Sequence, residues 1–297
     1  MPEVICFANM KGGVGKTTLC VNLAYALFSQ RKKVLLIDND PQFNASSSLI
    51  KPARYIKFLK DSEKNTIYRI YEKEPRLVGG VTPTVNPKSF IERTWFFKGT
   101  DHQLDVIPSQ IELYETLKNP TGKEYRLNKF LKENAQDYDY ILIDCPPTPS
   151  VLTHSAFMAS RHVVIPITPD YYAAMGLPQF LSTLSEFKDG MPDEHDVRVL
   201  GAVFTNVPQQ ETSSSRKARK SVISALNKHG VSINILKSEM ITYQAYRKAV
   251  WDSNPVQQLK GKGSQGKTKA SRDIRNIAAE LLELIKHRNG TTDEDEK

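Results

Sequence analysis

The chain has 297 residues, of which 39% are hydrophobic and 25% charged, the composition of an ordinary globular protein with a substantial core. No stretch approaches the roughly 18 to 20 apolar residues of a membrane span, and no signal-peptide pattern is present, so we expect a cytoplasmic protein without membrane association. The net charge of +8 is compatible with polyanionic partners. The three cysteines (Cys6, Cys20 and Cys145) lack C-x-x-C spacing, which argues against a disulfide framework or a metal cluster.

The first predicted strand spans 4–8, and the segment after it reads Met-Lys-Gly-Gly-Val-Gly-Lys-Thr-Thr at 10–18. Apolar residues at helical spacing follow at Leu19, Val21, Leu23, Ala24 and Leu27. A strand that ends in a glycine-rich turn and opens into a helix points backbone N–H groups inward, and the helix N-terminus adds the positive end of its dipole. This order of elements predicts a polyphosphate site.

The residue types in this loop suit phosphate binding. Gly12, Gly13 and Gly15 provide backbone freedom and allow a phosphate to approach closely. Lys16 can reach the β- and γ-phosphates, and the Thr17 hydroxyl can bind Mg²⁺. The alternative is a glycine turn with solvated lysines, which the strand before it and the helix after it disfavour.

The spelling of the loop departs from the ordinary phosphate loop, which has glycine at the position of Met10 and lacks a lysine like Lys11. The form K-G-G-x-G-K-T resembles the deviant Walker A motif of the ParA/MinD-type ATPases. The resemblance implies that ATP is the ligand and that Lys11 reaches across a dimer to the partner's nucleotide, so that Lys11 and Lys16 are both catalytic. The implied ATP-binding residues of the loop are Lys11, Gly12, Gly13, Val14, Gly15, Lys16, Thr17 and Thr18.

The second predicted strand, 34–37, leads into Asp-Asn-Asp-Pro-Gln at 38–42. Carboxylates at the end of a strand suit a metal ion and a water molecule. The segment resembles the D-x-D-P-Q-x-N switch of the ParA family, which implies that Asp40 positions the attacking water and that Asp38 supports the Mg²⁺ site. The alternative is that Asp38 caps a helix and Asp40 makes a local turn.

Residues 51 to 100 show the weakest pattern, with turn residues at Gly79, Gly80, Pro83 and Pro87. We predict an insertion of short helices and loops at about 51–103, within a single ATPase domain that spans 1–288. Such an insertion offers a surface for a partner or a dimer.

Further apolar runs at 104–107, 140–143, 163–167 and 199–204 alternate with helix-length amphipathic segments. Strands that are apolar on both faces and alternate with helices predict a doubly wound α/β fold, with a mostly parallel sheet covered on both faces. Ligands of such sheets bind at the carboxyl ends of the strands, where the phosphate loop and the segments 38–42 and 144–147 fall.

Asp144 ends the run 140–143 and matches the Walker B aspartate that holds Mg²⁺ or its water. A strand-terminal aspartate that makes only turn hydrogen bonds is the alternative. The implied metal-site residues are Thr17, Asp38, Asp40 and Asp144. The two later strands also resemble those of the family, which implies that Asn206 and Pro208 contact the adenine base.

A second segment, 261–268, matches the standard phosphate-loop spelling letter for letter. No apolar run precedes it and its neighbours are glutamine and lysine, so we interpret it as a basic loop.

Basic residues cluster in the C-terminal third of the chain, and ParA-type dimers bind DNA through scattered basic residues of this region. The resemblance therefore implies binding to phosphates without a base code, with a steep salt dependence. Solvated helix faces are the alternative. The predicted DNA-binding residues are Arg216, Lys217, Arg219, Lys220, Arg247, Lys248, Lys267 and Lys269.

Apolar residues at helical spacing between Ile274 and Ile285 predict a final helix, and 289–297 reads as a disordered acidic tail. An anionic membrane would repel this acidic end, so a MinD-like membrane-targeting role is disfavoured.

Taken with the resemblance, these residues predict a Mg²⁺-dependent ATPase that dimerises on ATP and binds DNA nonspecifically. It would associate with the nucleoid and partition a plasmid or chromosome with a ParB-like adaptor. One alternative is an ATPase of the same fold that positions a protein cargo over the nucleoid. Another is an ATP-dependent enzyme that acts on a small substrate.

Overall fold

The computed structural model describes residues 1–72, 86–190, 196–228, 233–261 and 266–292. Within them the chain forms one seven-stranded sheet in the order β3-β4-β2-β5-β1-β6-β7. Every neighbouring pair is parallel except β3 and β4, which confirms the predicted doubly wound α/β fold. The strands are β1 Glu3–Phe7, β2 Val34–Asp38, β3 Glu92–Phe96, β4 Gln103–Ile107, β5 Tyr140–Asp144, β6 His162–Ile167 and β7 Arg198–Phe204.

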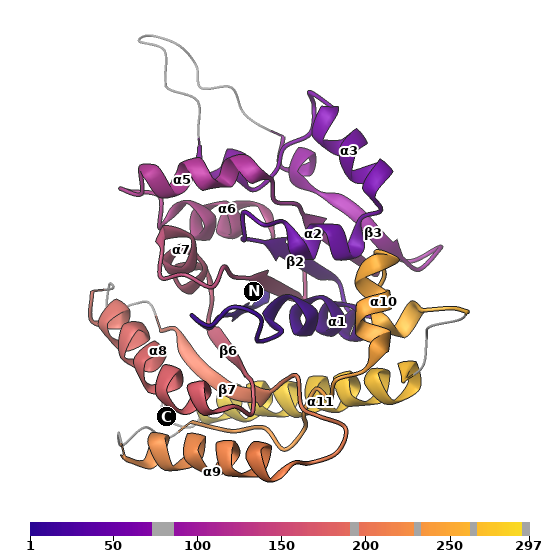
Figure 1. Cartoon of the computed structure of the whole chain (residues 1–297). Coiled ribbons are helices and arrows are strands. Elements are labelled where there is room, and N and C mark those ends of the chain that lie inside the picture. The colour runs from indigo at the N-terminus through magenta and orange to yellow at the C-terminus, as the bar shows by residue number, and fades with distance from the viewer. Residues whose placement is uncertain (73–85, 191–195, 229–232, 262–265, 293–297) are drawn as a thin grey trace.

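Helices cover both faces of the sheet. One apolar core joins the sheet to α1, α10 and α11, and a second joins it to α6, α7 and α8 (Figure 1). The short helix η3 (Val256–Gln258) precedes α11, and η1 and η2 span Pro87–Phe90 and Ile111–Leu113. The α-helices are α1 Lys16–Ser29, α2 Asn44–Leu49, α3 Pro52–Lys60, α4 Tyr68–Tyr71, α5 Tyr114–Lys118, α6 Arg126–Asn134, α7 Val151–Ala159, α8 Tyr171–Asp189, α9 Ser213–Lys228, α10 Gln244–Trp251 and α11 Lys267–Thr292.

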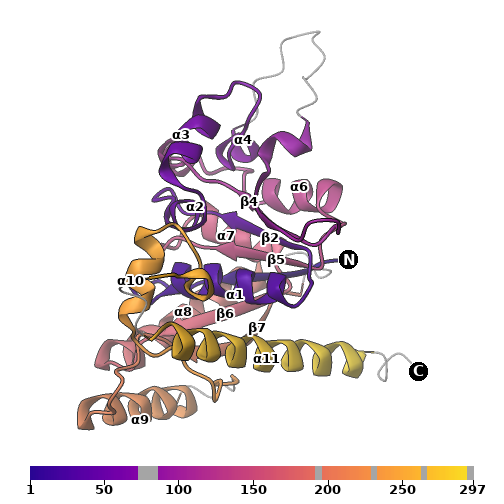
Figure 2. The same ribbon diagram turned by 90° about the vertical axis from the view of Figure 1, so that its right-hand side faces the viewer.

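Burial on both faces explains why the central strands are continuously apolar. All residues of β2 and β6 are buried, so neither strand shows the alternation expected of a sheet with one wet face. Figure 2 shows the N-terminus, where β1 starts, on the side of the molecule opposite α3, α9 and α10. The carboxyl ends of the parallel strands therefore face the side on which these three helices lie.

The insertion is only partly as predicted. It contains the short helices α3, α4 and η1, but the expectation of helices and loops alone is wrong, because β3 adds an antiparallel edge strand. The ring of Trp95 packs edge-on against Tyr25, with centroids 5.3 Å apart. The strand combines three polar residues with Trp95 and Phe96, and each of its residues is partly or fully exposed, so the sequence lacks the apolar run of a buried strand. Gly79, Gly80 and Pro83 lie outside the described residues.

The C-terminal helix was predicted correctly, but its end was not. Helix α11 continues to Thr292, so the predicted boundary at 288 falls inside the helix, and residues 293–297 lie outside the described part of the chain. The segment 261–268 follows η3 rather than a strand, consistent with its rejection as a phosphate loop, although 262–265 are not described. Among the helices that the structure describes, none combines the length and the hydrophobicity that a membrane-spanning helix needs.

A buried carboxyl group on β4 should make stability depend on pH. Asp105 is 1% exposed, its Oδ2 accepts hydrogen bonds from Tyr138 and Gln103, both 2.7 Å long, and burial nevertheless raises its pKa. A carboxyl whose pKa is higher in the folded than in the unfolded state reduces stability as pH rises from the unfolded pKa to the folded pKa. We expect Asp105→Asn to gain melting temperature relative to wild type as the pH is raised above 3.8, the ordinary value. A difference in melting temperature that is constant from acid to neutral pH would contradict this.

Candidate active site

The glycine-rich loop joins β1 to α1 at the carboxyl edge of the sheet. Gly13 and Gly15 have φ angles of +72° and +83°, in the left-handed region that favours glycine. A Cβ on Gly15 would lie 3.0 Å from the Met240 methyl group, so this position also needs the small residue for packing. Gly12 adopts no such angle and has open space around it.

Lys16 folds into the centre of the loop. Its side chain is 6% exposed, and Nζ donates 3.1 Å hydrogen bonds to the backbone carbonyls of Asn9 and Lys11. Burial lowers the pKa of Lys16, against the attraction of Asp144. Helix α1 starts at the same place, and no side chain of the described residues caps its N-terminus. A cation and free backbone N–H groups thus converge, which is the arrangement that binds phosphate.

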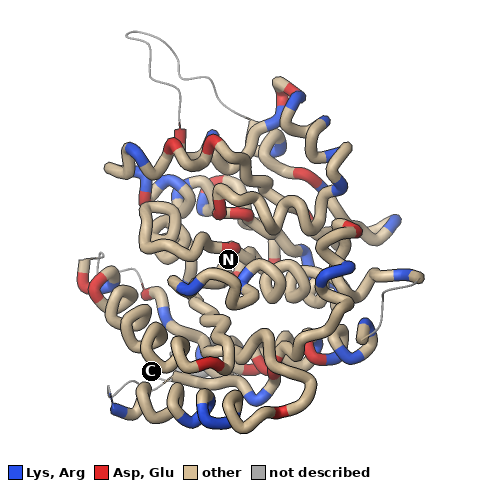
Figure 3. The backbone as a smooth tube through the Cα atoms, in the orientation of Figure 1, with Lys and Arg blue, Asp and Glu red and all other residues tan. Residues whose placement is uncertain are grey.

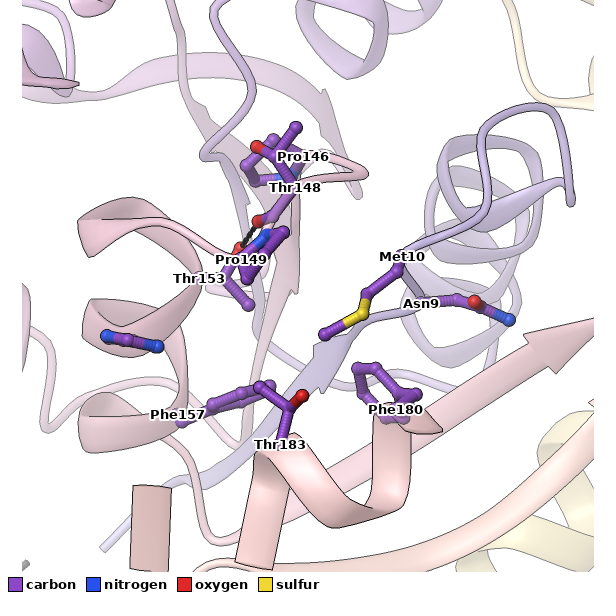
Figure 4. A pocket seen from close by; sticks show the side chains of 10 residues that line it. Asn9, Met10, Pro146, Thr148, Pro149, Thr153, Phe157, Phe180 and Thr183 are labelled. Carbon is purple, nitrogen blue, oxygen red and sulfur yellow. Dashed lines mark hydrogen bonds between the residues drawn. The ribbon is translucent and has the colours of Figure 1, made fainter. Parts of the chain in front are cut away.

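Met10, which replaces the first glycine of an ordinary phosphate loop, has a packing role. Its side chain reaches into a narrow slit of about 10 Å³ between the loop after β5 and the helices α7 and α8 (Figure 4). Phe157 and Phe180 line the slit, which has room for about one water molecule. Met10 therefore packs the start of the phosphate loop against α7 and α8.

The predicted Walker B aspartate lies beside the phosphate loop. The Thr17 hydroxyl donates a 2.7 Å hydrogen bond to Asp144 Oδ2. Asp144 Oδ1 is buried and has no hydrogen-bond partner within the part of the chain that the structure describes. Burial, together with Asp38, raises the pKa of Asp144 well above its usual range. A buried carboxylate oxygen without a partner next to a hydroxyl fits a hydrated Mg²⁺, which prefers such oxygen ligands.

The two predicted switch aspartates have different surroundings. Asp38 is fully buried, and its Oδ2 accepts 2.7 Å hydrogen bonds from the backbone N–H and hydroxyl of Ser46. Burial raises its pKa to about 7. Asp40 is 6% exposed, accepts a hydrogen bond from the Gln42 N–H at 2.9 Å and interacts with the charge of Lys16. Asp38 thus braces the start of α2, whereas Asp40 faces the phosphate loop.

Asp38, Asp40 and Asp144 lie at the same sheet edge, and Asp38 is paired in register with Asp144. Among the described residues, no three His, Cys, Asp or Glu side chains are grouped closely enough to hold a metal ion by themselves.

Lys11, the other lysine of the loop, points toward Asp170 rather than toward Lys16. Lys11 Nζ forms an ion pair with Asp170 of its own chain and a 3.2 Å hydrogen bond with the Thr168 hydroxyl. Asp170 also caps α8 by accepting a 3.1 Å hydrogen bond from the Ala173 N–H. Burial alone would raise the pKa of Asp170, but hydrogen bonds from Lys11 and Thr168 hold this pKa below its usual range. Sequence reasoning missed Asp170, although a Thr-Pro-Asp at a strand end is a helix-start signal.

Asn206, a predicted contact of the adenine base, lies against the phosphate loop. Its backbone has a φ angle of +52°, and its side-chain amide donates a 2.8 Å hydrogen bond to the Gly13 carbonyl. Pro208, the other predicted base contact, is half-buried two residues further on.

Large apolar side chains are exposed at the start of α8, next to Lys11. Tyr171, Tyr172 and Met175 are 68%, 70% and 65% exposed. Lys11 Nζ lies 5.7 Å from the centre of the Tyr172 ring. A cluster of exposed apolar groups beside a charged site is typical of a surface that another protein covers.

The predicted DNA-binding residues lie on α9, α10 and the start of α11, where Figure 3 shows positive segments with acidic ones between them. Some of these cations are engaged within the chain. Arg219 pairs with Glu239, with Nη2 2.9 Å from the carboxylate, and is only 20% exposed. Arg216 pairs with Glu211 at 2.9 Å, and Lys248 with Asp252 at 2.8 Å. Lys267 donates to a backbone carbonyl, that of Leu259.

The remaining four predicted cations differ from these. Lys217, Lys220, Arg247 and Lys269 are exposed, and no ion pair involves them within the described ranges. The free part of the predicted surface therefore consists of two lysines on α9, one arginine on α10 and one lysine on α11.

Comparison with known proteins identifies the family of this chain. A family model described as AAA domain matches residues 2–197. The chain is 35% identical over 204 residues to the chromosome partitioning protein ParA of Myxococcus xanthus. The aligned region covers 68% of this chain and 64% of that protein. It is 39% identical over 187 residues to the sporulation initiation inhibitor protein Soj of Bacillus subtilis, with 62% and 65% covered. The chain thus spans slightly less than two thirds of the length of these two relatives.

A solved structure also resembles the whole chain. The crystal structure of cobyrinic acid a,c-diamide synthase from Mycobacterium smegmatis with bound ATP analog and magnesium superposes with a TM-score of 0.71. The two are 25% identical, and the match covers 95% of this chain and 94% of that one. The family match over residues 2–197 and the two curated relatives show that this chain belongs to the ParA-type partition ATPase family.

Proposed function

We propose that the protein hydrolyses ATP with Mg²⁺. The observation that carries this proposal is the pairing of Thr17 with Asp144 beside the buried Lys16. Lys16 and the N-terminus of α1 bind the phosphates, and Thr17 and Asp144 hold the metal, which neutralises phosphate charge when it is bound. Asp40 positions the water that attacks the γ-phosphate in line. Asn206, and Pro208 beside it, contact the adenine base.

We propose that ATP brings two copies together through the carboxyl edge of the sheet. In the dimer, Lys11 leaves Asp170 and reaches the partner's nucleotide. Two observations support this: the pairing of Lys11 with a residue outside its own phosphate loop, and the exposed apolar cluster of Tyr171, Tyr172 and Met175 next to it. Hydrolysis would remove the γ-phosphate that holds Lys11 and release the dimer.

In the proposed dimer the Lys11–Asp170 ion pair is broken, which opposes dimerisation. Asp170→Asn should free Lys11 and lower the ATP concentration at which dimers appear by up to about fivefold, because exposed pairs are worth roughly 0.2–1 kcal/mol. Sedimentation at increasing ATP concentration measures this. Asp252→Asn, which frees Lys248 on α10, is the matched control and should leave the midpoint unchanged. A midpoint that rises in Asp170→Asn would mean that Asp170 supports the dimer instead.

We further propose that the ATP-bound dimer binds DNA without sequence preference and partitions a plasmid or chromosome together with a ParB-like adaptor, on the nucleoid in the cytoplasm. The partitioning proteins among its relatives support this proposal. The exposed lysines of α9, Lys217 and Lys220, are the strongest candidates for phosphate contacts.

A gel-shift assay with random-sequence duplex DNA tests this proposal. The assay is run without nucleotide, with ADP and with ATP plus Mg²⁺, each at two salt concentrations. We expect binding with ATP only. Replacing Lys217 and Lys220 by alanine should weaken it and reduce the salt slope by about 2, since each lost phosphate contact lowers the slope by roughly 0.9. Lys57 and Lys60, exposed on α3 at the same spacing, form the matched control pair. Equal losses in both pairs would show that net charge, not this surface, binds DNA.

The solved synthase favours one other candidate function, because its name denotes an enzyme of small molecules. ATP turnover that requires a metabolite and neither DNA nor an adaptor would support that candidate. ATP-gated DNA binding with an adaptor unrelated to centromere binding would instead indicate a protein cargo.

A further inference from the structure

A tyrosine of the insertion is hydrogen-bonded to the switch segment. Tyr71, at the end of α4, is fully buried, and its hydroxyl donates a 2.8 Å hydrogen bond to Oδ1 of Asn39. The same hydroxyl lies 3.0 Å from the Ser155 hydroxyl on α7. Asn39 stands between Asp38 and Asp40 in the chain, so Tyr71 contacts the residue next to the proposed water-positioning carboxylate.

Asn39 makes two further hydrogen bonds, and it is the donor in both. The Asn39 N–H donates to the Asp144 carbonyl at 3.0 Å, and its side-chain amide donates to the Leu152 carbonyl at 2.7 Å. Asn39 therefore ties the segment to the Walker B strand and to α7 through its donors. Tyr71 occupies its acceptor, Oδ1, and a buried acceptor left without a donor would be costly.

Tyr71 is itself held from outside the site. Its backbone carbonyl accepts a hydrogen bond from the Arg126 side chain of α6, and the Ile67 N–H donates to the Pro108 carbonyl at 2.9 Å. The adjacent Glu72 carboxylate pairs with Lys123 and accepts a 2.9 Å hydrogen bond from Thr116. The position of the hydroxyl is thus set by α5, α6 and the loop after β4.

A second tyrosine of the insertion reaches the other side of the segment. The Tyr55 hydroxyl on α3 donates to the Ser109 carbonyl, and the Ser109 N–H donates to the Ser46 hydroxyl at 3.0 Å. Ser46 in turn holds Asp38. The insertion therefore supports the Asp38–Asp40 segment from two sides, through tyrosine hydroxyls whose hydrogen bonds, among the described residues, go to Asn39, Ser155 and Ser109.

We propose that Tyr71 is a positioning residue for the hydrolysis step, an inference that rests on the proposed ATPase function. By holding Asn39, the hydroxyl keeps the backbone of Asp40 where its carboxylate can orient the attacking water. A displacement of about 1 Å at such a group is enough to slow a reaction by about a hundredfold. ATP binding does not depend on Tyr71, because the phosphate loop is held by other contacts. The insertion thus sets the turnover rate as well as offering a surface.

The test is Tyr71→Phe, which removes only the hydroxyl, in steady-state ATPase assays and in titrations with a fluorescent ATP analogue. We expect kcat to fall by about tenfold, within the range for a misplaced catalytic group, while the Kd for nucleotide changes less than about twofold. Tyr138→Phe is the matched control, because it also loses a buried hydroxyl hydrogen bond, of 2.7 Å to Asp105, away from the site. Its kcat should be that of wild type.

An Asp40→Ala background separates positioning from a general structural effect. If Tyr71 acts through Asp40, adding Tyr71→Phe to Asp40→Ala lowers turnover no further. Unchanged kcat in Tyr71→Phe, or an equal loss of kcat in Tyr138→Phe, would overturn the inference. Absence of ATP hydrolysis by the wild-type chain would instead refute the proposed function on which the inference rests.

Discussion

Lys16→Ala is expected to weaken ATP binding by about a hundredfold, because a hydrogen bond to a charged group is worth about 1.5–3 kcal/mol and this lysine is proposed to reach two phosphates. The Lys16 ammonium donates hydrogen bonds to two backbone carbonyls, which phosphate oxygens can replace. Isothermal titration with a non-hydrolysable ATP analogue and Mg²⁺ measures the change.

Lys11→Ala is the matched control for this experiment. It removes a lysine from the same loop, but one whose side chain points toward Asp170 rather than into the loop. Nucleotide binding by the monomer should survive, whereas turnover and dimerisation should be lost. Should both variants lose binding equally while their melting temperatures stay at the wild-type value, the distinct roles assigned to the two lysines would be wrong.

Asp40→Ala has the second large effect. It should bind ATP and dimerise but lower kcat by about a hundredfold or more, since a positioned acid–base group contributes typically 10²–10⁴-fold. The Asp40 carboxylate faces the loop and makes a hydrogen bond with the Gln42 N–H, which a local turn can lose without unfolding. Single-turnover hydrolysis and light scattering of the ATP-bound state measure the two properties separately.

Asp137→Ala serves as the control, because Asp137 is exposed in the loop before β5, at the opposite edge of the sheet. Its turnover should match wild type. Normal hydrolysis by Asp40→Ala would refute the switch assignment and direct attention to the other carboxylates at this edge.

The residues changed in these two predictions, Lys16 and Asp40, were both identified from the sequence. Lys16 stands nine residues after the end of β1 and Asp40 two residues after the end of β2, and in a parallel sheet the strand ends share one edge. Local spacing therefore predicted the doubly wound fold and the phosphate loop. It also predicted which carboxylates lie near that loop, before any contact was known.

The insertion and the basic surface were less predictable. The edge strand β3 carries mixed polar and aromatic residues, so its pairing with β4 decides its structure more than its own pattern does. Arg219 looks like a surface cation in sequence, yet it is engaged by Glu239, twenty residues away. Which cations are free depends on acidic partners that only the folded chain brings close.

The sequence by itself thus determined the architecture, the phosphate loop and the family, because these depend on short-range patterns of apolar, glycine and charged residues. Only the tertiary structure decided that Lys11 pairs with Asp170, that Asp38 braces Ser46 and that Tyr71 holds Asn39. Lys11–Asp170 and Tyr71–Asn39 join distant parts of the chain through single hydrogen-bonding groups. Such contacts leave no periodic signal in the sequence, because they follow from how helices and loops dock on the sheet rather than from the propensity of any segment.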